Sequence, residues 1–200
     1  MNTYLGISSE LGPDDVSDTV AGSAEILFLE GYLYDKPKGM QAFERAVDLC
    51  HKAGGKAGIA LSDPFCVDRH RSDFRRLVKS LDYVIGNEHE WSSLYQTDLS
   101  AALEQAAADS GLVVCTRSGH DVIVVRGEEQ AVVPVRRVVP VDATGAGDQF
   151  AAGFLYGLAT GQPLATAGRM GCVAAAEVIN HFGARPETDL KALFHKEGLI

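Results

Sequence analysis

The hydrophobic positions of this chain follow two patterns that alternate from its start to its end. Short apolar runs such as 26–30 and 112–116 are typical of strands buried inside a parallel sheet. Longer segments such as 40–53 carry apolar residues every three or four positions, which is typical of helices. The alternation predicts an α/β fold, in which helices flank a doubly wound, mainly parallel sheet.

The same patterns, bounded by glycine and proline, give the expected order of elements. The predicted strands are 26–30, 56–62, 83–86, 112–116 and 138–141, with a hairpin formed by 121–126 and 130–135. The predicted helices are 40–53, 67–80, 87–95, 99–110, 146–160, 164–181 and 189–196. A chain of 200 residues with 46% hydrophobic content buries one good core, so we expect one domain over residues 1–200.

A glycine-rich segment, Asp142–Phe150, opens onto the predicted helix 146–160. Three small residues stand where this helix is expected to start: Gly145, Ala146 and Gly147. The first N–H groups of a helix lack internal partners and carry the positive end of the helix dipole, so this turn predicts an anion site. Asp148 follows in the first turn. A carboxylate there repels a phosphate, so its expected role is to accept a proton from a hydroxyl that attacks the phosphorus.

Two common phosphate-binding motifs do not fit this segment. A Walker A loop ends in Gly-Lys-Ser/Thr, and no lysine lies between Lys79 and Lys191. The dinucleotide motif G-x-G-x-x-G needs a glycine where Phe150 stands, three residues after Gly147. A glycine-rich turn with an ordinary capping aspartate stays open as the structural alternative.

Polar residues follow two other predicted strands. Asn87 follows 83–86, and Thr116–Gly119 follows 112–116. Ligands of open α/β sheets bind beyond the carboxyl ends of the strands, so we expect these residues to converge on one crevice with the glycine-rich segment. Asn87 and Glu90 also have the spacing of a capping box, which is the structural alternative for that pair.

The glycine-rich segment resembles the second signature of the ribokinase/PfkB carbohydrate kinase family, which usually reads D-T-x-G-A-G-D-x-F. Ala143 departs from the residues usual at its position. Asn87 and Glu90 match the N-x-x-E motif of the same family. The resemblance implies a ribokinase-like fold and a kinase, a phosphotransferase that uses ATP and Mg²⁺.

The resemblance also implies roles for particular residues. Asp148 would be the general base, and the N–H groups of Gly145, Ala146 and Gly147 would stabilise the transferring phosphoryl group. The nucleotide-binding residues implied are Asn87, Thr116, Ser118, Gly119, Gly147 and Asn180. The metal-site residues implied are Glu90, which would act on Mg²⁺ through water, and Asp142 and Thr144, which lie where relatives hold a potassium ion.

The acceptor is a sugar or a nucleoside hydroxymethyl group, and bacterial adenosine kinase is the first expectation. A ribose- or fructose-type sugar kinase is the alternative within the family. If the chain is not an enzyme, the alternative is a non-catalytic nucleotide-binding fragment of such a kinase. The run Gly31–Asp35 follows a predicted strand and either lines the acceptor pocket or forms a packed loop, of which the packed loop is slightly favoured.

The resemblance runs from residue 1 to about residue 185 but covers only the C-terminal two-thirds of a family member. The Gly-Gly signature, the acidic residue that grips the sugar hydroxyls and the small β lid would all precede Met1. Residues 1–6 are expected to form an internal strand. We therefore expect a truncated gene product, a misplaced start or a fragment, which lacks the N-terminal third. The missing lid argues against turnover by this chain alone, and the exposed sheet edge invites aggregation or pairing with a partner such as a second copy.

Charge and cysteine content restrict the partners. The net charge of −9 argues against nucleic acids and anionic membranes, and no apolar stretch reaches the roughly 18 residues of a membrane span. The four cysteines are far apart and lack zinc-ligand spacing. Scattered thiols are typical of a reducing cytoplasm, which is the expected location.

Overall fold

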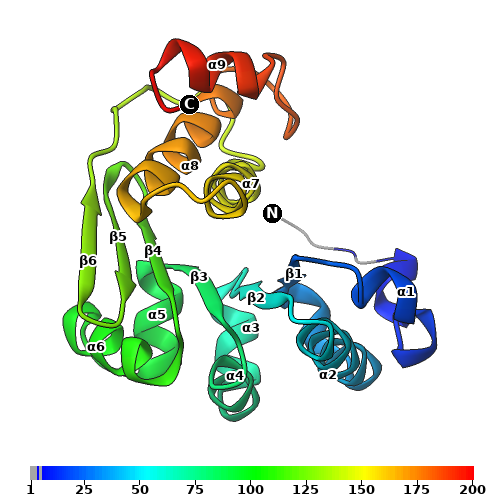
Figure 1. Cartoon of the computed structure of the whole chain (residues 1–200). Helices are drawn as coiled ribbons and strands as arrows, with labels where there is room; N and C mark the ends of the chain where they lie inside the picture. The colour runs from blue at the N-terminus through cyan, green and yellow to red at the C-terminus, as the bar shows by residue number, and fades with distance from the viewer. Residues whose placement is uncertain (1–3, 5) are drawn as a thin grey trace. The chain divides into compact units, whose positions relative to one another are not determined.

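In the computed structural model, which describes Tyr4 and residues 6–200, the chain forms two compact units (Figure 1). The first unit extends to Cys115 and the second runs from Thr116 to Ile200. The strands form a six-stranded mixed sheet in chain order, β1 to β6, which confirms the predicted α/β class. The expectation of one domain stays a prediction, and the strand expected over residues 1–6 falls largely outside the described residues.

The first unit alternates strands with helices. Its elements are η1 (Gly6–Glu10), η2 (Pro13–Asp15), α1 (Asp18–Ala21), β1 (Ile26–Glu30), η3 (Gly31–Asp35), α2 (Pro37–Lys52), β2 (Lys56–Ala60), α3 (Pro64–Arg69), α4 (Arg71–Val78), β3 (Tyr83–Asn87), α5 (Glu88–Tyr95), α6 (Leu99–Asp109) and β4 (Val113–Arg117), whose end belongs to the second unit. Strands β1, β2 and β3 are parallel, with Leu29 opposite Ile59 and Ile59 opposite Val84. Right-handed crossovers in a sheet of sequential order place their helices on one face, and Figure 1 shows α2, α4 and α5 on the same side of these strands.

The core of the first unit is built from the strand centres and a few large aromatic residues. Ile59 and Val84 are fully buried. The Trp91 side chain is also fully buried, and its indole N–H donates to the Val114 carbonyl over 3.0 Å. A buried Trp N–H with a partner removes the free-energy cost of an unpaired donor, so α5 is firmly attached to the sheet. This attachment fixes the start of α5, where Asn87 and Glu90 lie.

The second unit combines a hairpin with three helices. Its further elements are β5 (His120–Arg126), β6 (Glu129–Val133), α7 (Ala146–Ala159), α8 (Leu164–Val178) and α9 (Leu190–Lys196). Helices α7 and α8 approach closely, because a Cβ on Gly153 would lie 2.6 Å from the Met170 carbonyl oxygen and one on Gly157 would lie 2.7 Å from Ala167. This close packing fixes the two helix ends that carry the candidate site.

The predicted strand 138–141 is wrong. Residues 134–145 contain no strand, and Val139 and Val141 are 89% and 51% exposed. Pro140 has no N–H for a sheet ladder, and the Val141 N–H donates instead to the Ile179 carbonyl at the end of α8 over 2.8 Å. The glycine-rich segment therefore follows an extended connection that lies against α8.

Most other boundaries agree with the sequence patterns within a few residues. The helix predicted over 67–80 is instead two helices, α3 and α4, which meet at His70, whose φ of −121° and ψ of 27° are not helical. The loop predicted over 31–39 contains the short helix η3 and the first turn of α2. Within the part of the chain that the structure describes, no helix is both long and apolar enough to cross a membrane.

Candidate functional site

The first turn of α7 is shaped by Gly145, which caps the helix in the left-handed conformation with φ of 81°. That conformation favours glycine, because a Cβ is strained there. A Cβ on Gly145 would also lie 2.8 Å from the Ala184 Cβ and 2.9 Å from its carbonyl oxygen. Helix α7 begins at Ala146, and Asp148 is exposed in its first turn, as the sequence predicts. The sequence therefore needs glycine at 145 for folding alone.

The fold does not require glycine at position 147 as it does at position 145. Gly147 is the second residue of α7 and is exposed. Apart from its chain neighbours and the nearby backbone of its own helix, no protein atom lies within 4 Å of the position that a Cβ would take. A helix interior favours alanine over glycine by about 1 kcal/mol, so an open glycine costs stability. The open space beside bare backbone at a helix N-terminus fits a phosphate group that approaches the main chain closely.

The three N–H groups predicted to bind the anion are not equivalent. The Ala146 N–H donates to the Ala143 carbonyl over 3.3 Å, which is a long hydrogen bond. The first regular helical bond of the turn is the one from the Gln149 N–H to the Gly145 carbonyl, at 2.9 Å. The N–H groups of Gly145 and Gly147 are therefore better placed than that of Ala146 for an anion.

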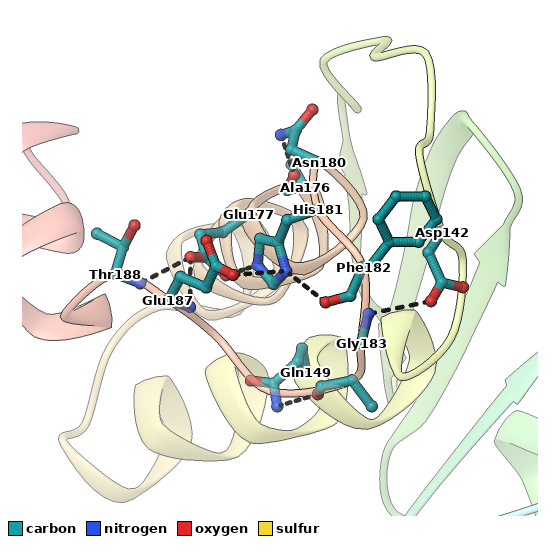
Figure 2. Close-up of polar contacts among 11 residues, drawn as sticks. Asp142, Gln149, Ala176, Glu177, Asn180, His181, Phe182, Gly183, Glu187 and Thr188 are labelled. Atoms are coloured by element: carbon teal, nitrogen blue, oxygen red, sulfur yellow. Dashed lines mark hydrogen bonds and ion pairs between the residues drawn. The ribbon is translucent and has the colours of Figure 1, made fainter.

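Asp142 connects two loops in the second unit (Figure 2). Its Oδ1 accepts the Thr144 hydroxyl at 2.7 Å and the Thr144 N–H at 2.9 Å. Its Oδ2 accepts the Gly183 N–H at 3.1 Å, the contact that Figure 2 draws. The Thr144 hydroxyl and N–H, with the Gly183 N–H, lower the pKa of Asp142 below its usual value. The carboxylate thus holds the glycine-rich segment to the residues that follow α8.

Asn180, which is expected to bind the nucleotide, lies just after the end of α8. Its side chain is exposed, and its amide donates to the Ala176 carbonyl of α8. His181 Nε2 lies 3.4 Å from Glu177 Oε2. Burial acts to lower the pKa of His181, but the Phe182 carbonyl and the carboxylates of Glu177 and Glu187 outweigh it and raise the pKa. A role of Asn180 in nucleotide binding stays a prediction.

The residues Thr116–Gly119 form the tight turn between β4 and β5. Ser118 and Gly119 both have positive φ, 38° and 88°, as expected for a two-residue hairpin turn. The Arg117 Nε–H donates to the Asp121 carbonyl over 2.7 Å, so this guanidinium is held within the hairpin. An ordinary hairpin turn explains this geometry without a ligand, and the expected contacts of Thr116, Ser118 and Gly119 with a nucleotide stay predictions.

In the first unit, Asn87 and Glu90 form the capping box that their spacing predicts. Asn87 Oδ1 accepts the Glu90 N–H at 3.0 Å, while the Asn87 N–H and side-chain amide donate to the two Glu90 carboxylate oxygens at 2.7 and 2.8 Å. Glu90 is only 4% exposed. Burial, with a smaller contribution from the negative charge of Asp63, raises the pKa of Glu90 to about 7. The hydrogen bond from the Asn87 N–H acts to lower this pKa but does not outweigh burial.

This capping box has a consequence for the metal prediction. Both Glu90 carboxylate oxygens already have partners on Asn87, so a contact with Mg²⁺ through water would share them. Among the described residues, no group of three or more His, Cys, Asp or Glu side chains could hold a metal ion. Mg²⁺ is commonly held by substrate phosphates and water with one or two carboxylates, so a contribution of Glu90 and a potassium site near Asp142 and Thr144 stay predictions.

A pocket of about 500 Å³ lies within the first unit. Its lining residues are Tyr4, Gly6, Ser9, Tyr32, Asp35, Lys36, Asp63, Phe65, Cys66 and Arg69. The run Gly31–Asp35 is therefore divided between the two roles expected for it. Tyr32 and Asp35 line the pocket, whereas Tyr34 is 1% exposed and packs against Phe43 and Phe74.

The sequence reasoning missed two side chains that support the second unit's loops. Glu177 accepts the N–H groups of Glu187 and Thr188 at 2.9 and 2.8 Å. Gln149 Nε2 donates to the Ala184 carbonyl over 3.4 Å. The available signal for the first of these was the four-residue spacing of Glu177 and His181, which fall on one face of the predicted helix 164–181.

Comparisons with known proteins found a matching family model and similar solved structures. The model of the pfkB family of carbohydrate kinases matches residues 1–190. The structure is similar to a probable sugar kinase from Rhizobium etli, with a TM-score of 0.93 and 41% identity over 96% of this chain. It is also similar to adenosine kinase from Sinorhizobium meliloti, with a TM-score of 0.91 and 39% identity over 94% of this chain.

A more distant structure shares the fold. A putative ribokinase II from Escherichia coli, solved in complex with ATP and Mg²⁺, has a TM-score of 0.85 and 18% identity over 95% of this chain and 63% of its own. The chain covers 59% of each of the other two solved chains, and it spans about half the length of the curated relatives that it matches.

Proposed function

Because the chain belongs to the pfkB family of carbohydrate kinases, we propose that it transfers the γ-phosphate of ATP to a hydroxymethyl group of a nucleoside or a sugar. One observation carries the proposal: the first turn of α7 has an open glycine at 147 and an exposed carboxylate, Asp148, one residue later. A helix N-terminus binds a phosphate, and a carboxylate beside it accepts a proton.

In the proposed reaction, the Asp148 carboxylate takes the proton of the acceptor hydroxyl as that oxygen bonds to the γ-phosphorus. The bond between the γ-phosphorus and the bridging oxygen of ADP breaks, and ADP leaves with that electron pair. The N–H groups of Gly145 and Gly147 stabilise the negative charge on the transferring phosphoryl oxygens. Mg²⁺ enters with ATP and supplies charge neutralisation on its phosphates.

Adenosine is the proposed acceptor. The likeness to the adenosine kinase of Sinorhizobium meliloti extends over 94% of this chain at 39% identity, which supports a nucleoside. The probable sugar kinase of Rhizobium etli is similar to the same degree and supports a sugar such as ribose or fructose as the alternative. Within the first unit, the rings of Tyr32 and Phe65 in the pocket offer a flat apolar surface that fits a base or a sugar face.

We also propose that the protein works in the cytoplasm, where ATP and Mg²⁺ are supplied. Its four cysteines are free thiols, and three of them are buried. Free thiols without disulfide partners are typical of a reducing compartment.

The proposal is tested by ADP release in a coupled assay with adenosine, cytidine, ribose and fructose as acceptors. We expect adenosine to raise ADP release above the rate without acceptor. Asp148→Asn should lower that rate by about a hundredfold or more, because it removes the base and keeps the size of the side chain. Asp121→Asn, an exposed change in the hairpin, is the matched control and should leave the rate unchanged.

The other outcomes separate the alternatives. Turnover with ribose or fructose but not with a nucleoside would make the protein a sugar kinase. ATP binding without turnover of any acceptor would support a non-catalytic nucleotide-binding protein. No binding of ATP would contradict the assignment of the α7 turn.

A further inference from the structure

The segment 181–188, which follows α8, forms one wall of the α7 turn. The Ala184 Cβ and carbonyl oxygen lie within 2.9 Å of where a Cβ on Gly145 would be. This contact means that a shift of Ala184 changes the space around the N–H groups of the turn. The position of the segment is therefore a determinant of the anion site.

Gly183 and Ala184, in the first half of this segment, are held by hydrogen bonds to the glycine-rich segment Asp142–Phe150. The Gly183 N–H donates to Asp142, and the Ala184 carbonyl accepts from the Gln149 amide, as Figure 2 shows. Gly183 itself has φ of 98°, and residues 182–185 are exposed, so the middle of the segment has little packing of its own. Exposed segments with few packed side chains open readily unless hydrogen bonds hold them.

The far end is held by one carboxylate on α8. Glu177 Oε1 accepts the N–H groups of Glu187 and Thr188 at 2.9 and 2.8 Å, and Oε2 faces His181 Nε2 at 3.4 Å (Figure 2). The Glu177 side chain is only 9% exposed. A carboxylate in the last turn of a helix is disfavoured by the negative end of the helix dipole. Glu177 is stable there because the N–H groups of Glu187 and Thr188, the Thr188 side chain and His181 surround it, and all of these belong to the segment 181–188.

We propose that Glu177 is a positioning residue of the phosphate-transfer site: it fastens the segment 181–188 so that Ala184 stays against the first turn of α7. Glu177 acts through Glu187 and Thr188 and does not touch the nucleotide. The inference rests on the proposed function, because it matters to catalysis only if the α7 turn binds the phosphates of ATP. It assigns a role to a side chain that the chemistry itself does not use.

The first experiment measures amide hydrogen exchange in the full chain without nucleotide. Glu177→Ala should speed exchange in peptides covering 181–188 by about tenfold or more, because it removes charge-assisted hydrogen bonds. Glu177→Gln keeps an oxygen that accepts both N–H groups and should restore most of the protection. Lys191→Gln changes an exposed side chain at the start of α9, outside the segment, and is the control that should leave exchange unchanged. Unchanged exchange in Glu177→Ala would overturn the inference.

The second experiment measures the affinity for MgATP and the KM for the acceptor in the same variants. Glu177→Ala should weaken ATP binding by about tenfold while the acceptor KM stays constant, and Glu177→Gln should rescue it. Faster exchange with unchanged ATP affinity would overturn the positioning role. If the wild-type chain does not bind ATP, the proposed function fails, and the exchange result still decides whether Glu177 holds the segment.

Discussion

Glu90 is a carboxylate enclosed by protein, and its environment makes the stability of the fold depend on pH. Burial raises its pKa to about 7, against the opposing effect of the Asn87 N–H. A raised pKa in the folded state means that the folded chain binds this proton more tightly than the unfolded chain does. The stability that Glu90 contributes is therefore fully present below its ordinary pKa of about 4.5 and is lost as the pH rises through about 7.

The Glu90→Gln variant tests this coupling. Glutamine keeps the shape and an acceptor oxygen but does not titrate, so the variant should gain stability relative to wild type as the pH rises from 5 to 8. The gain should be roughly 3 kcal/mol at most, from a pKa raised to about 7. Urea unfolding at several pH values measures it, with Glu104→Gln, an exposed change in α6, as the control. A difference that is constant across pH would contradict the assigned pKa.

At the scale of elements, the start of α5 shows a helix cap with two tasks. Asn87 receives the first N–H groups of the helix, and it also donates to both oxygens of the buried Glu90. The cap of α6, Asp98, only accepts the Ala101 N–H at 3.1 Å in an exposed position. Removal of the two caps should therefore have different costs.

We expect Asn87→Ala to destabilise the fold by roughly 2 to 4 kcal/mol, because it removes a cap and leaves a buried carboxylate without donors. Asp98→Ala should cost only about 1 kcal/mol, the usual value for a cap. Chemical denaturation of the two variants at neutral pH compares them. Equal losses would mean that Asn87 acts as a cap and nothing more.

The elements that the sequence predicts well are those defined by local patterns. Strand β1 was predicted with both its ends, since a short apolar run is bounded there by turn residues. The run 138–141 has the same β-branched character, but Pro140 lacks an N–H and Val141 donates to Ile179 of α8. A partner 38 residues away in the chain leaves no trace in a local pattern.

The same contrast applies to the candidate site. The places of Gly145 and Asp148 at the start of α7 were predicted because small residues followed by a carboxylate at a helix start form a short local pattern. The supporting side chains, Glu177 and Gln149, were not predicted. Their hydrogen bonds reach 10 to 35 residues along the chain and depend on how α7 and α8 pack.

At the scale of the whole molecule, the net charge of −9 bears on the proposed binding of ATP. A long-range field of that sign repels a polyanionic ligand, although salt screens it beyond about 8 Å under physiological conditions. The affinity for ATP must therefore come from short-range groups. In the proposed function these are the N–H groups at the start of α7 and the Mg²⁺ that accompanies ATP.

The Gly147→Ala variant tests this central claim most directly. Outside the neighbouring backbone of α7, a Cβ at this position meets no protein atom within 4 Å, and alanine is the better helix former, so the variant should be as stable as wild type or more stable by about 0.5–1 kcal/mol. The same methyl group would occupy the space where a phosphate approaches the backbone. Ala152→Ser, an exposed change two turns along α7, is the control.

The measurement is the affinity for MgATP by titration calorimetry in wild type, Gly147→Ala and Ala152→Ser. The account predicts that Gly147→Ala loses about tenfold or more in affinity while its free energy of unfolding does not fall, and that Ala152→Ser binds as wild type does. Unchanged ATP affinity in Gly147→Ala would contradict the account, because it would place the phosphates away from the first turn of α7.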